Sequence, residues 1–297
     1  MATNHAIVAE GLTKSYGDVH AVRGVDLEIA TGECFAMLGP NGAGKTTCTE
    51  IFEGFRSRTS GRVEVLGQDP AKAPRSWKAR LGIVLQTSRD LTDLTVAESV
   101  DHFAAYYPDA RDPAEVIDAV GLSAKARVRS TALSGGQRRR LDVALGIIGK
   151  PEVLFLDEPT TGFDPEARRQ FWDLIDGLKD DGTTILLTTH YMEEAEALAD
   201  RVAVLAQGRV VACDSPERLS GRQDDSAHVS WLSPDGPKSI QTSTPTQTVS
   251  ELAAQFGGEV PELAVMRPSL EDIYLKLIEH DEALATADTP TAEELGK

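Results

Sequence analysis

Short runs of apolar residues, separated by polar breaks, predict a sheet domain that begins near the start of the chain. Apolar and polar positions alternate over residues 7–9 and 25–29, which predicts two half-exposed strands of an antiparallel sheet. Residues 34–38 form a continuous apolar run, the pattern of a parallel strand that is covered on both faces. Residues 46–52 then have helical character. A strand, a glycine-rich loop and a helix are therefore predicted to follow one another directly.

The pattern turns mostly helical between residues 91 and 149. We predict a helical subdomain there, over about residues 87–149, inserted into the sheet domain. Strand patterns then return at residues 153–156, 184–187, 202–205 and 209–212. Helical patterns at residues 165–178 and 192–199 lie between them, so strands and helices alternate as in a parallel sheet. We therefore predict one α/β domain over residues 1–219, built on a mixed sheet.

The composition changes after Leu219, where a polar segment marks a predicted domain boundary. We assign residues 220–280 to a small C-terminal α+β domain. A strand at residues 228–232 precedes a Thr/Ser/Pro-rich stretch and then a helix, for which Thr248 and Glu251 have capping-box spacing. After another strand, Ser269 and Asp272 are spaced to cap a last helix. Residues 281–297 form an acidic tail rich in Ala and Thr, so we predict that they are disordered.

The amino-acid composition argues against several classes of function. The net charge is −17, from 30 basic and 47 acidic residues among 297, and a surface this acidic argues against direct binding to nucleic acid. No segment reaches the roughly 18 uninterrupted apolar residues of a membrane span, and no signal-peptide pattern opens the chain. The three cysteines lack metal-ligand spacing, which is typical of reduced thiols in a reducing compartment. We therefore expect a cytosolic protein that needs a separate spanning partner for any work at a membrane.

A phosphate-binding loop (P-loop) is the first chemical motif. Its pattern is complete in Gly39-Pro40-Asn41-Gly42-Ala43-Gly44-Lys45-Thr46, which Thr47 follows. Glycines let the backbone wrap around phosphate oxygens without a Cβ clash, and the helix that follows adds its positive N-terminal end. Lys45 supplies a point charge between the β- and γ-phosphates, and Thr46 offers a hydroxyl to Mg²⁺. The alternative is a glycine-rich turn that merely joins a strand to a helix.

Two carboxylates, Asp157 and Glu158, end the strand predicted at residues 153–156. Sheets of α/β proteins bind ligands at the carboxyl ends of their strands. We predict that Asp157 holds Mg²⁺, directly or through water, and that Glu158 polarises the attacking water as a general base. Strand ends also carry ordinary solvated acids, so this motif alone leaves both interpretations open.

The segment Leu133-Ser134-Gly135-Gly136-Gln137 precedes a helical run. A Ser-Gly-Gly turn leaves bare N–H groups at the start of a helix, which forms a second anion-binding site. The alternative is a helix cap at Ser134 beside a flexible turn.

The P-loop and the segment of residues 133–137 occur in this order on one chain. Together they resemble the motifs of the nucleotide-binding subunit of an ATP-binding-cassette (ABC) transporter, and the resemblance covers about residues 6–219. The resemblance implies a P-loop NTPase-like ABC ATPase core, ATP and Mg²⁺ as cofactors, and hydrolysis that powers a separate integral-membrane permease. It also implies a head-to-tail dimer. Ser134, Gly135, Gly136 and Gln137 of one copy would contact the ATP held by the other. The subunit would lie at the cytoplasmic face of the cell membrane, peripheral through its partner.

Three single residues and one loop match positions of this family. Gln86 resembles the glutamine that reaches Mg²⁺ and signals to the transport partner, and His190 resembles the histidine that orients the γ-phosphate and water. Tyr16 resembles the aromatic residue that stacks on adenine. Residues 160–165, which include Asp164, resemble the loop that crosses the dimer interface in this family, and Phe163 stands in place of the leucine of many members.

Residues 267–274 resemble the corresponding stretch in ATPases of two-component exporters of the daunorubicin-resistance type. The predicted function is therefore to power export of a drug, antibiotic or lipid-like substrate. An import ATPase remains an alternative. An ABC ATPase that acts on DNA or on the ribosome agrees less well, because no heptads separate the two motifs and the acidic surface suits RNA poorly.

Overall fold

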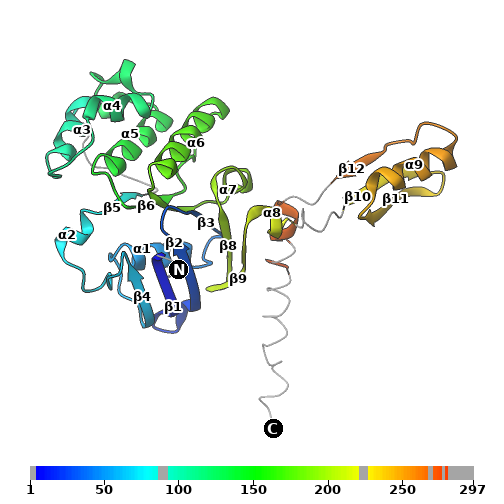
Figure 1. The fold of residues 1–297 in the computed structure, drawn as a ribbon, viewed down its shortest axis with the longest axis horizontal. Coiled ribbons are helices and arrows are strands. Elements are labelled where there is room, and N and C mark those ends of the chain that lie inside the picture. Colours follow the sequence, from blue (N-terminus) through cyan, green and yellow to red (C-terminus); the bar gives the residue numbers. More distant parts are fainter. Residues whose placement is uncertain (1–4, 86–92, 221–226, 267–269, 276–277, 280–297) are drawn as a thin grey trace, which may run out of the picture. The chain divides into compact units, whose positions relative to one another are not determined.

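The computed structural model describes residues 5–85, 93–220, 227–266, 270–275 and 278–279. The chain divides into two compact units, Met1–Val211 and Ala212–Lys297. The first unit contains two sheets and a group of helices, and the second contains a small sheet with one helix packed on it (Figure 1). The predicted domain boundary after Leu219 falls a few residues beyond this division.

The first sheet is antiparallel, with the strand order β2-β1-β4. The two strands predicted here are present but much longer, because β1 spans His5–Tyr16 and β2 spans Val19–Ala30. The third strand, β4 (Ser60–Val65), was not predicted, although Val63 and Val65 alternate with polar residues and are buried.

The second sheet has the order β5-β6-β7-β3-β8-β9 and forms the centre of the first unit. Its strands are β3 (Cys34–Leu38), β5 (Leu81–Val84), β6 (Val153–Asp157), β7 (Thr184–Thr188), β8 (Arg201–Ala206) and β9 (Arg209–Asp214). β3 pairs in parallel with both β7 and β8, and β6 pairs in parallel with β5 and β7. Every residue of β3 and β7 is buried, as the continuous apolar run of β3 predicts. The predicted mixed architecture, an ABC ATPase core, is confirmed.

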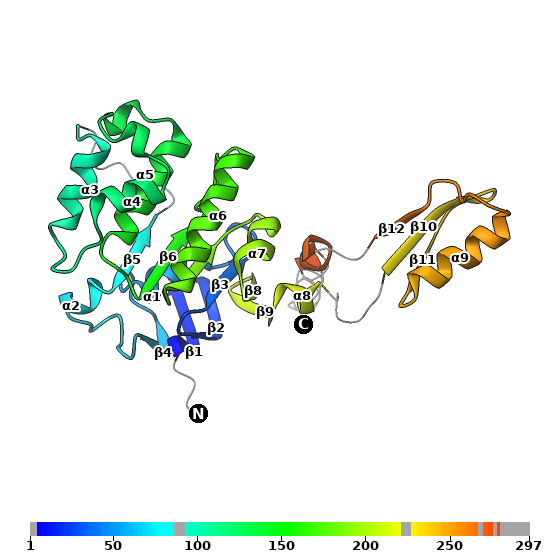
Figure 2. The ribbon, with the colours of Figure 1, turned by 45° about the horizontal axis from the view of Figure 1, so that its top comes forward.

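Three helices of the first unit stand together at one end in both views: α3, α4 and α5 (Figures 1 and 2). They lie in the region predicted as a helical subdomain. The helices of this unit are α1 (Lys45–Phe52), α2 (Arg75–Lys78), α3 (Val96–Ala104), α4 (Pro113–Ala119), α5 (Gly135–Ile147), α6 (Pro165–Asp180) and α7 (Met192–Leu198). Short 3₁₀ turns, η1 (Ser123–Lys125) and η2 (Ser130–Ala132), precede α5. No helix in the described parts of the chain combines the length and the apolar character needed to cross a membrane.

The second unit holds an antiparallel sheet of order β11-β10-β12. Its elements are α8 (Pro216–Leu219), β10 (Ala227–Ser233), β11 (Gly236–Thr242), α9 (Pro245–Phe256) and β12 (Ala264–Met266). Val229 of β10, Leu252 of α9 and Val260 form its buried core. One helix on one face of three strands is the α+β arrangement predicted for this region.

The predicted capping box of Thr248 and Glu251 is wrong. α9 begins earlier, at Pro245, because the fixed φ of proline suits the first turn of a helix. Thr248 therefore lies inside the helix, where its hydroxyl donates to the carbonyl oxygen of Thr244 at 3.2 Å. Glu251 Oε1 accepts a hydrogen bond from Gln247 Nε2 at 2.9 Å. The predicted cap at Ser269 and the predicted disorder of residues 281–297 lie outside the described residues.

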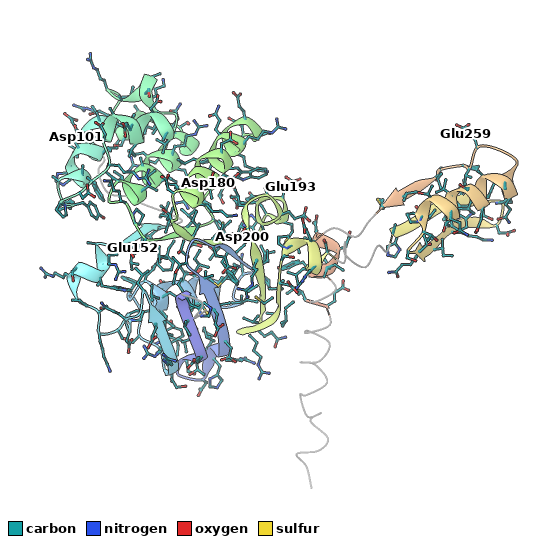
Figure 3. The ribbon with its side chains drawn as sticks, in the orientation of Figure 1. Asp101, Glu152, Asp180, Glu193, Asp200 and Glu259 are labelled. Atoms are coloured by element: carbon teal, nitrogen blue, oxygen red, sulfur yellow. The ribbon has the colours of Figure 1, made fainter. Side chains whose placement is uncertain are left out.

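The acidic excess is spread over separate elements. Figure 3 labels exposed acids from α3 (Asp101), α6 (Asp180), the position just before β8 (Asp200) and the second unit (Glu259). Three acids of the described residues are buried instead: Glu33, Glu194, and Glu53 at the C-terminal end of α1, which is 7% exposed. Burial raises the pKa of Glu53 to about 8, and the negative charges of Glu50 and Asp157 add to the shift.

The pKa of Glu53 gives a prediction about stability. The raised pKa means that the folded protein holds this proton more tightly than the unfolded chain, so its contribution to stability is full below about pH 4.5 and is lost as the pH rises through about 8. Glu53→Gln removes this titration. We expect the melting temperature of Glu53→Gln, relative to wild type, to be several degrees higher at pH 9 than at pH 6, as measured by calorimetry. The control is Glu259→Gln, and parallel melting curves for wild type and Glu53→Gln across this range would contradict the prediction.

Candidate active site

The P-loop runs from the end of β3 into α1, and the backbones of β2 and β8 lie very close to it. Gly44, the N-cap of α1, has a φ of 101°, and a Cβ there would lie 2.6 Å from the carbonyl oxygen of Ala21 in β2. A Cβ on Gly39 would collide with the carbonyl oxygen of Leu205 in β8. Glycine is therefore required at both positions, by conformation at Gly44 and by close approach at both.

A cavity of about 520 Å³ opens beside this loop. It brings together the P-loop, the two acids at the end of β6, and residues from β2 and the β8–β9 turn. The lining residues are Val19, His20, Ala21, Arg23, Asn41, Gly42, Gly44, Lys45, Thr46, Thr47, Asp157, Glu158 and Gln207. The P-loop and the acid pair Asp157–Glu158 therefore line the same cavity.

Lys45 is a buried cation of the cavity and is only 8% exposed. Its Nζ donates to the carbonyl oxygens of Gly39 at 2.6 Å and Pro40 at 3.2 Å. Burial lowers the pKa of Lys45, while the negative charges of Glu158 and Asp157 act in the opposite direction. An ammonium held by its own loop, beside two carboxylates, is placed to interact with a phosphate that enters the cavity.

The two acids take different environments at the end of β6. The Thr188 hydroxyl of β7 donates to Asp157 Oδ1. Glu158 follows in a left-handed conformation, with φ at 46°, and its backbone N–H donates to the Thr188 carbonyl at 2.9 Å. A left-handed φ is costly for a residue with a Cβ and occurs most often at functional sites.

His190 and Glu158 form a pair across the ends of β7 and β6. His190 Nδ1 lies 3.2 Å from Glu158 Oε1. The Glu158 side chain is 14% exposed, whereas that of His190 is 48% exposed and its ring centroid lies 4.1 Å from that of Tyr191. An imidazole that contacts a carboxylate in this way restricts the orientation of the Glu158 side chain.

Thr46 and Asp157 offer a hydroxyl and a carboxylate in the same cavity. This donor set fits Mg²⁺, which binds oxygen ligands and commonly takes one or two carboxylates together with substrate phosphates. No cluster of three or more acidic, His or Cys side chains suited to a metal occurs in the described part of the chain. The donors therefore fit a cation that is shared with a phosphate ligand.

The Ser134 segment forms a complete helix cap. The Ser134 hydroxyl accepts from the N–H of Gln137 at 3.3 Å, and Gln137 Oε1 accepts from the N–H of Ser134 at 3.1 Å, which closes a capping box at the start of α5. Among the described residues that line the P-loop cavity, none comes from residues 134–137. The structure therefore keeps the two predicted phosphate-binding motifs apart within one chain.

Tyr16 and Asp164, like His190, are not among the described residues that line the P-loop cavity. Tyr16 ends β1 at 41% exposure, and its ring lies beneath Lys14 Nζ, with 4.8 Å to the centroid. Asp164 caps α6, since its carboxylate accepts from the N–H of Ala167 at 2.7 Å. Gln86 lies outside the described residues.

Sequence reasoning missed the cavity residues contributed by β2 and the β8–β9 turn. Val19, His20, Ala21 and Arg23 follow the turn after β1, and Gln207 has a left-handed φ of 45°. No motif marks these positions. The two glycines at residues 17 and 208 indicate tight turns, which was the signal available.

Comparison with known proteins identifies the family. The family model described as "ABC transporter" matches residues 22–161. The Nod factor export ATP-binding protein I of Rhizobium johnstonii is 36% identical over 296 residues, which cover 92% of this chain and 94% of that protein. This chain belongs to the ABC transporter family. The daunorubicin resistance ATP-binding protein DrrA3 of Streptomyces coeruleorubidus is 34% identical over 312 residues, which cover 95% of this chain and 98% of that protein.

Solved structures show the same ABC fold. A structure described as an ATP binding subunit of an ABC transporter superposes with a TM-score of 0.70 at 21% identity, over 92% of this chain and 99% of that chain. The dimeric structure of MJ0796, a bacterial ABC transporter cassette, superposes with a TM-score of 0.64 at 24% identity, over 70% of this chain and 98% of that chain. The predicted resemblance to an ABC transporter ATP-binding subunit is confirmed. The chain is an ATPase whose ATP hydrolysis is coupled to transport.

The cavity geometry predicts the effect of removing the P-loop lysine. Lys45→Ala removes the ammonium and leaves the carbonyls of Gly39 and Pro40 without this donor. We expect ATP to bind about tenfold to hundredfold more weakly, the scale of a hydrogen bond to a charged group, as measured by titration calorimetry. The exposed residue Lys125 provides the control, as Lys125→Ala. Unchanged affinity for ATP in Lys45→Ala would contradict the placement of the phosphates in this cavity.

Proposed function

We propose that this ABC ATPase powers an exporter of drug, antibiotic or lipid-like molecules, through a separate integral-membrane subunit on whose cytoplasmic side it lies. The named activities of its relatives support the choice of export, since they concern Nod factor export and daunorubicin resistance. Both relatives match over nearly the whole chain, which includes the second unit.

The observation that carries the chemistry is the single cavity that holds Lys45, Asp157 and Glu158, with His190 on Glu158. In the proposed reaction, Glu158 takes a proton from water as the water oxygen attacks the γ-phosphorus of ATP. The bond from that phosphorus to the bridging oxygen breaks and yields ADP and phosphate. Lys45 neutralises charge on the phosphates, and His190 holds the Glu158 carboxylate.

Thr46 and Asp157 would hold Mg²⁺, with Gln86 as a further ligand. The cation would supply charge neutralisation between the β- and γ-phosphate oxygens. Within the chain, the Thr188 hydroxyl donates to Asp157 Oδ1, and this bond would hold the carboxylate for that role. For the nucleotide itself, the P-loop residues from Gly39 to Thr47 would bind the phosphates, and Tyr16 would stack on adenine.

The active state is proposed to be a head-to-tail dimer of two copies. Residues 134–137 do not line the P-loop cavity of their own chain, so a phosphate there would meet them only on a second copy. The helix N-terminus at Ser134 would then add its donors to the γ-phosphate, and the Asp164 loop would cross the interface. ATP would hold the two copies together until hydrolysis removes the γ-phosphate.

Removing the general base is the direct test of the reaction. Glu158→Gln keeps the shape of the side chain but cannot accept the proton from water. We expect turnover to fall by about 10² to 10⁴, the scale of a lost general base, while ATP binding is retained. Phosphate release measures turnover. Glu152→Gln, just before the other end of β6, serves as the control, and wild-type turnover in Glu158→Gln would remove Glu158 from this role.

Blocking the Ser134 segment tests the shared site. Ser134→Arg places a bulky side chain at the start of α5, so the first binding of ATP should stay within about twofold while ATP-dependent dimers disappear. Sedimentation of the Glu158→Gln background with ATP measures dimers. Ser215→Arg is a matched control, because Ser215 caps α8 through the N–H of Arg218 at 3.3 Å, the cap distance found at Ser134. Normal dimers in Ser134→Arg would refute the shared site.

A further inference from the structure

Arg139 in α5 joins three backbone segments through one buried guanidinium. The residue is 6% exposed. Its Nε donates to the carbonyl oxygen of Pro159 at 3.1 Å, and its two terminal nitrogens donate to the carbonyl oxygens of Leu85 and Asp157. Each nitrogen of the guanidinium thus serves a different carbonyl.

The three carbonyls lie where the parallel pairing of β5 and β6 ends. The last residues that pair between these strands are Val84 and Leu156, and the carbonyls of Leu85 and Asp157 come next along each strand. On its other side, Asp157 pairs with Thr188 of β7. Arg139 therefore takes over as a hydrogen-bond donor where the β5–β6 pairing stops, one residue before Glu158.

α5 reaches this point because it packs unusually close to β5. A Cβ on Gly146 of α5 would lie 2.7 Å from Val84 Cγ2, and a Cβ on Gly82 of β5 would collide with the carbonyl oxygen of Gly146. The two glycines allow the helix and the strand to touch through their backbones. Ser134 is the N-cap of the same helix, so Arg139 lies little more than one helical turn from it.

The surroundings of Arg139 are acidic. Burial lowers the pKa of Arg139, and the negative charges of Asp142, Asp157, Glu194 and Glu158 act against that effect. A guanidinium keeps its charge when buried, and its planar fork donates along several fixed directions. Lysine has one nitrogen on a flexible chain and would not span three carbonyls of separate segments.

We propose that Arg139 is a positioning residue for ATP hydrolysis, which fixes the backbone of Asp157 and Pro159 on either side of Glu158 and ties it to the Ser134 helix. The proposal rests on the function proposed above for Asp157 and Glu158. Arg139 itself does not line the P-loop cavity. Its effect passes through the main chain, because a shift of the Asp157 carbonyl moves both the Asp157 carboxylate and the left-handed turn at Glu158.

The test compares Arg139→Lys and Arg139→Gln with wild type in the full chain. We expect kcat to fall by about tenfold to hundredfold in both variants, the cost of displacing a reacting group by about 1 Å. The Mg²⁺ concentration that gives half-maximal turnover should rise. The Kd for ATP measured without Mg²⁺ should stay within about twofold of wild type, because the P-loop is untouched. Arg127→Gln is the control, since Arg127 is an exposed arginine of the same helical region.

Two outcomes would overturn the positioning role. One is a kcat and an Mg²⁺ dependence of both variants within about twofold of wild type. The other is a loss of ATP binding in parallel with turnover in both variants, which would identify Arg139 as a residue that only stabilises the fold. Glu158→Gln separates this inference from the proposed function. If Glu158→Gln abolishes turnover while the Arg139 variants hydrolyse ATP normally, only the positioning role fails, whereas normal turnover in Glu158→Gln removes the proposed base itself.

Discussion

The parallel pairing of β3, β7 and β6 is the constraint on which the site depends. Thr188 of β7 pairs with Met37 of β3 on one side and with Asp157 of β6 on the other. Adjacent strands lie about 4.8 Å apart, so these three residues form a row about 10 Å wide at the carboxyl edge of the sheet. Immediately beyond this row, β3 continues into the P-loop, β6 into Glu158, and β7 into His190. The cavity is a consequence of that register, since a slip of one residue would turn Asp157 to the other face.

Charge balance is the second requirement of the site. The chain carries a large excess of acidic residues, yet two cations, Lys45 and Arg139, lie beside the end of β6. Lys45 lies on the cavity side of Asp157 and Glu158, and Arg139 lies on the backbone side of the same strand end. Both cations are buried and held by main-chain carbonyls. Carbonyl oxygens fix each cation in place without neutralising it, so Lys45 keeps its positive charge beside the two acids and the cavity.

The sequence was sufficient for the parts of the site that local chemistry specifies. The apolar run of β3 and the glycines after it predicted the strand–loop–helix unit. The two acids at the end of β6 predicted that the site lies at the carboxyl edge of the sheet. The residues that were missed are set by tertiary contacts. Ala21 lies at the cavity because β2 packs on Gly44, and no local pattern records that approach. Arg139 resembles any other arginine of a basic helix until α5 is seen to touch β5 through Gly82 and Gly146. The capping-box error at Thr248 arose because a proline at the true start outweighs a well-spaced pair one turn later.

The helix cap observed at Ser134 is compatible with the anion site proposed for the same segment. The capping box uses the N–H groups of Ser134 and Gln137, through each other's side chains. The N–H groups of Gly135 and Gly136 lie between them, in the first turn, where a helix supplies no acceptor of its own. Neither glycine has a side chain to cover its donor. The cap therefore fixes the turn, and the glycines leave two donors at a positive helix end. In the proposed dimer, this cap would hold the two donors in place before a phosphate of a second copy meets them.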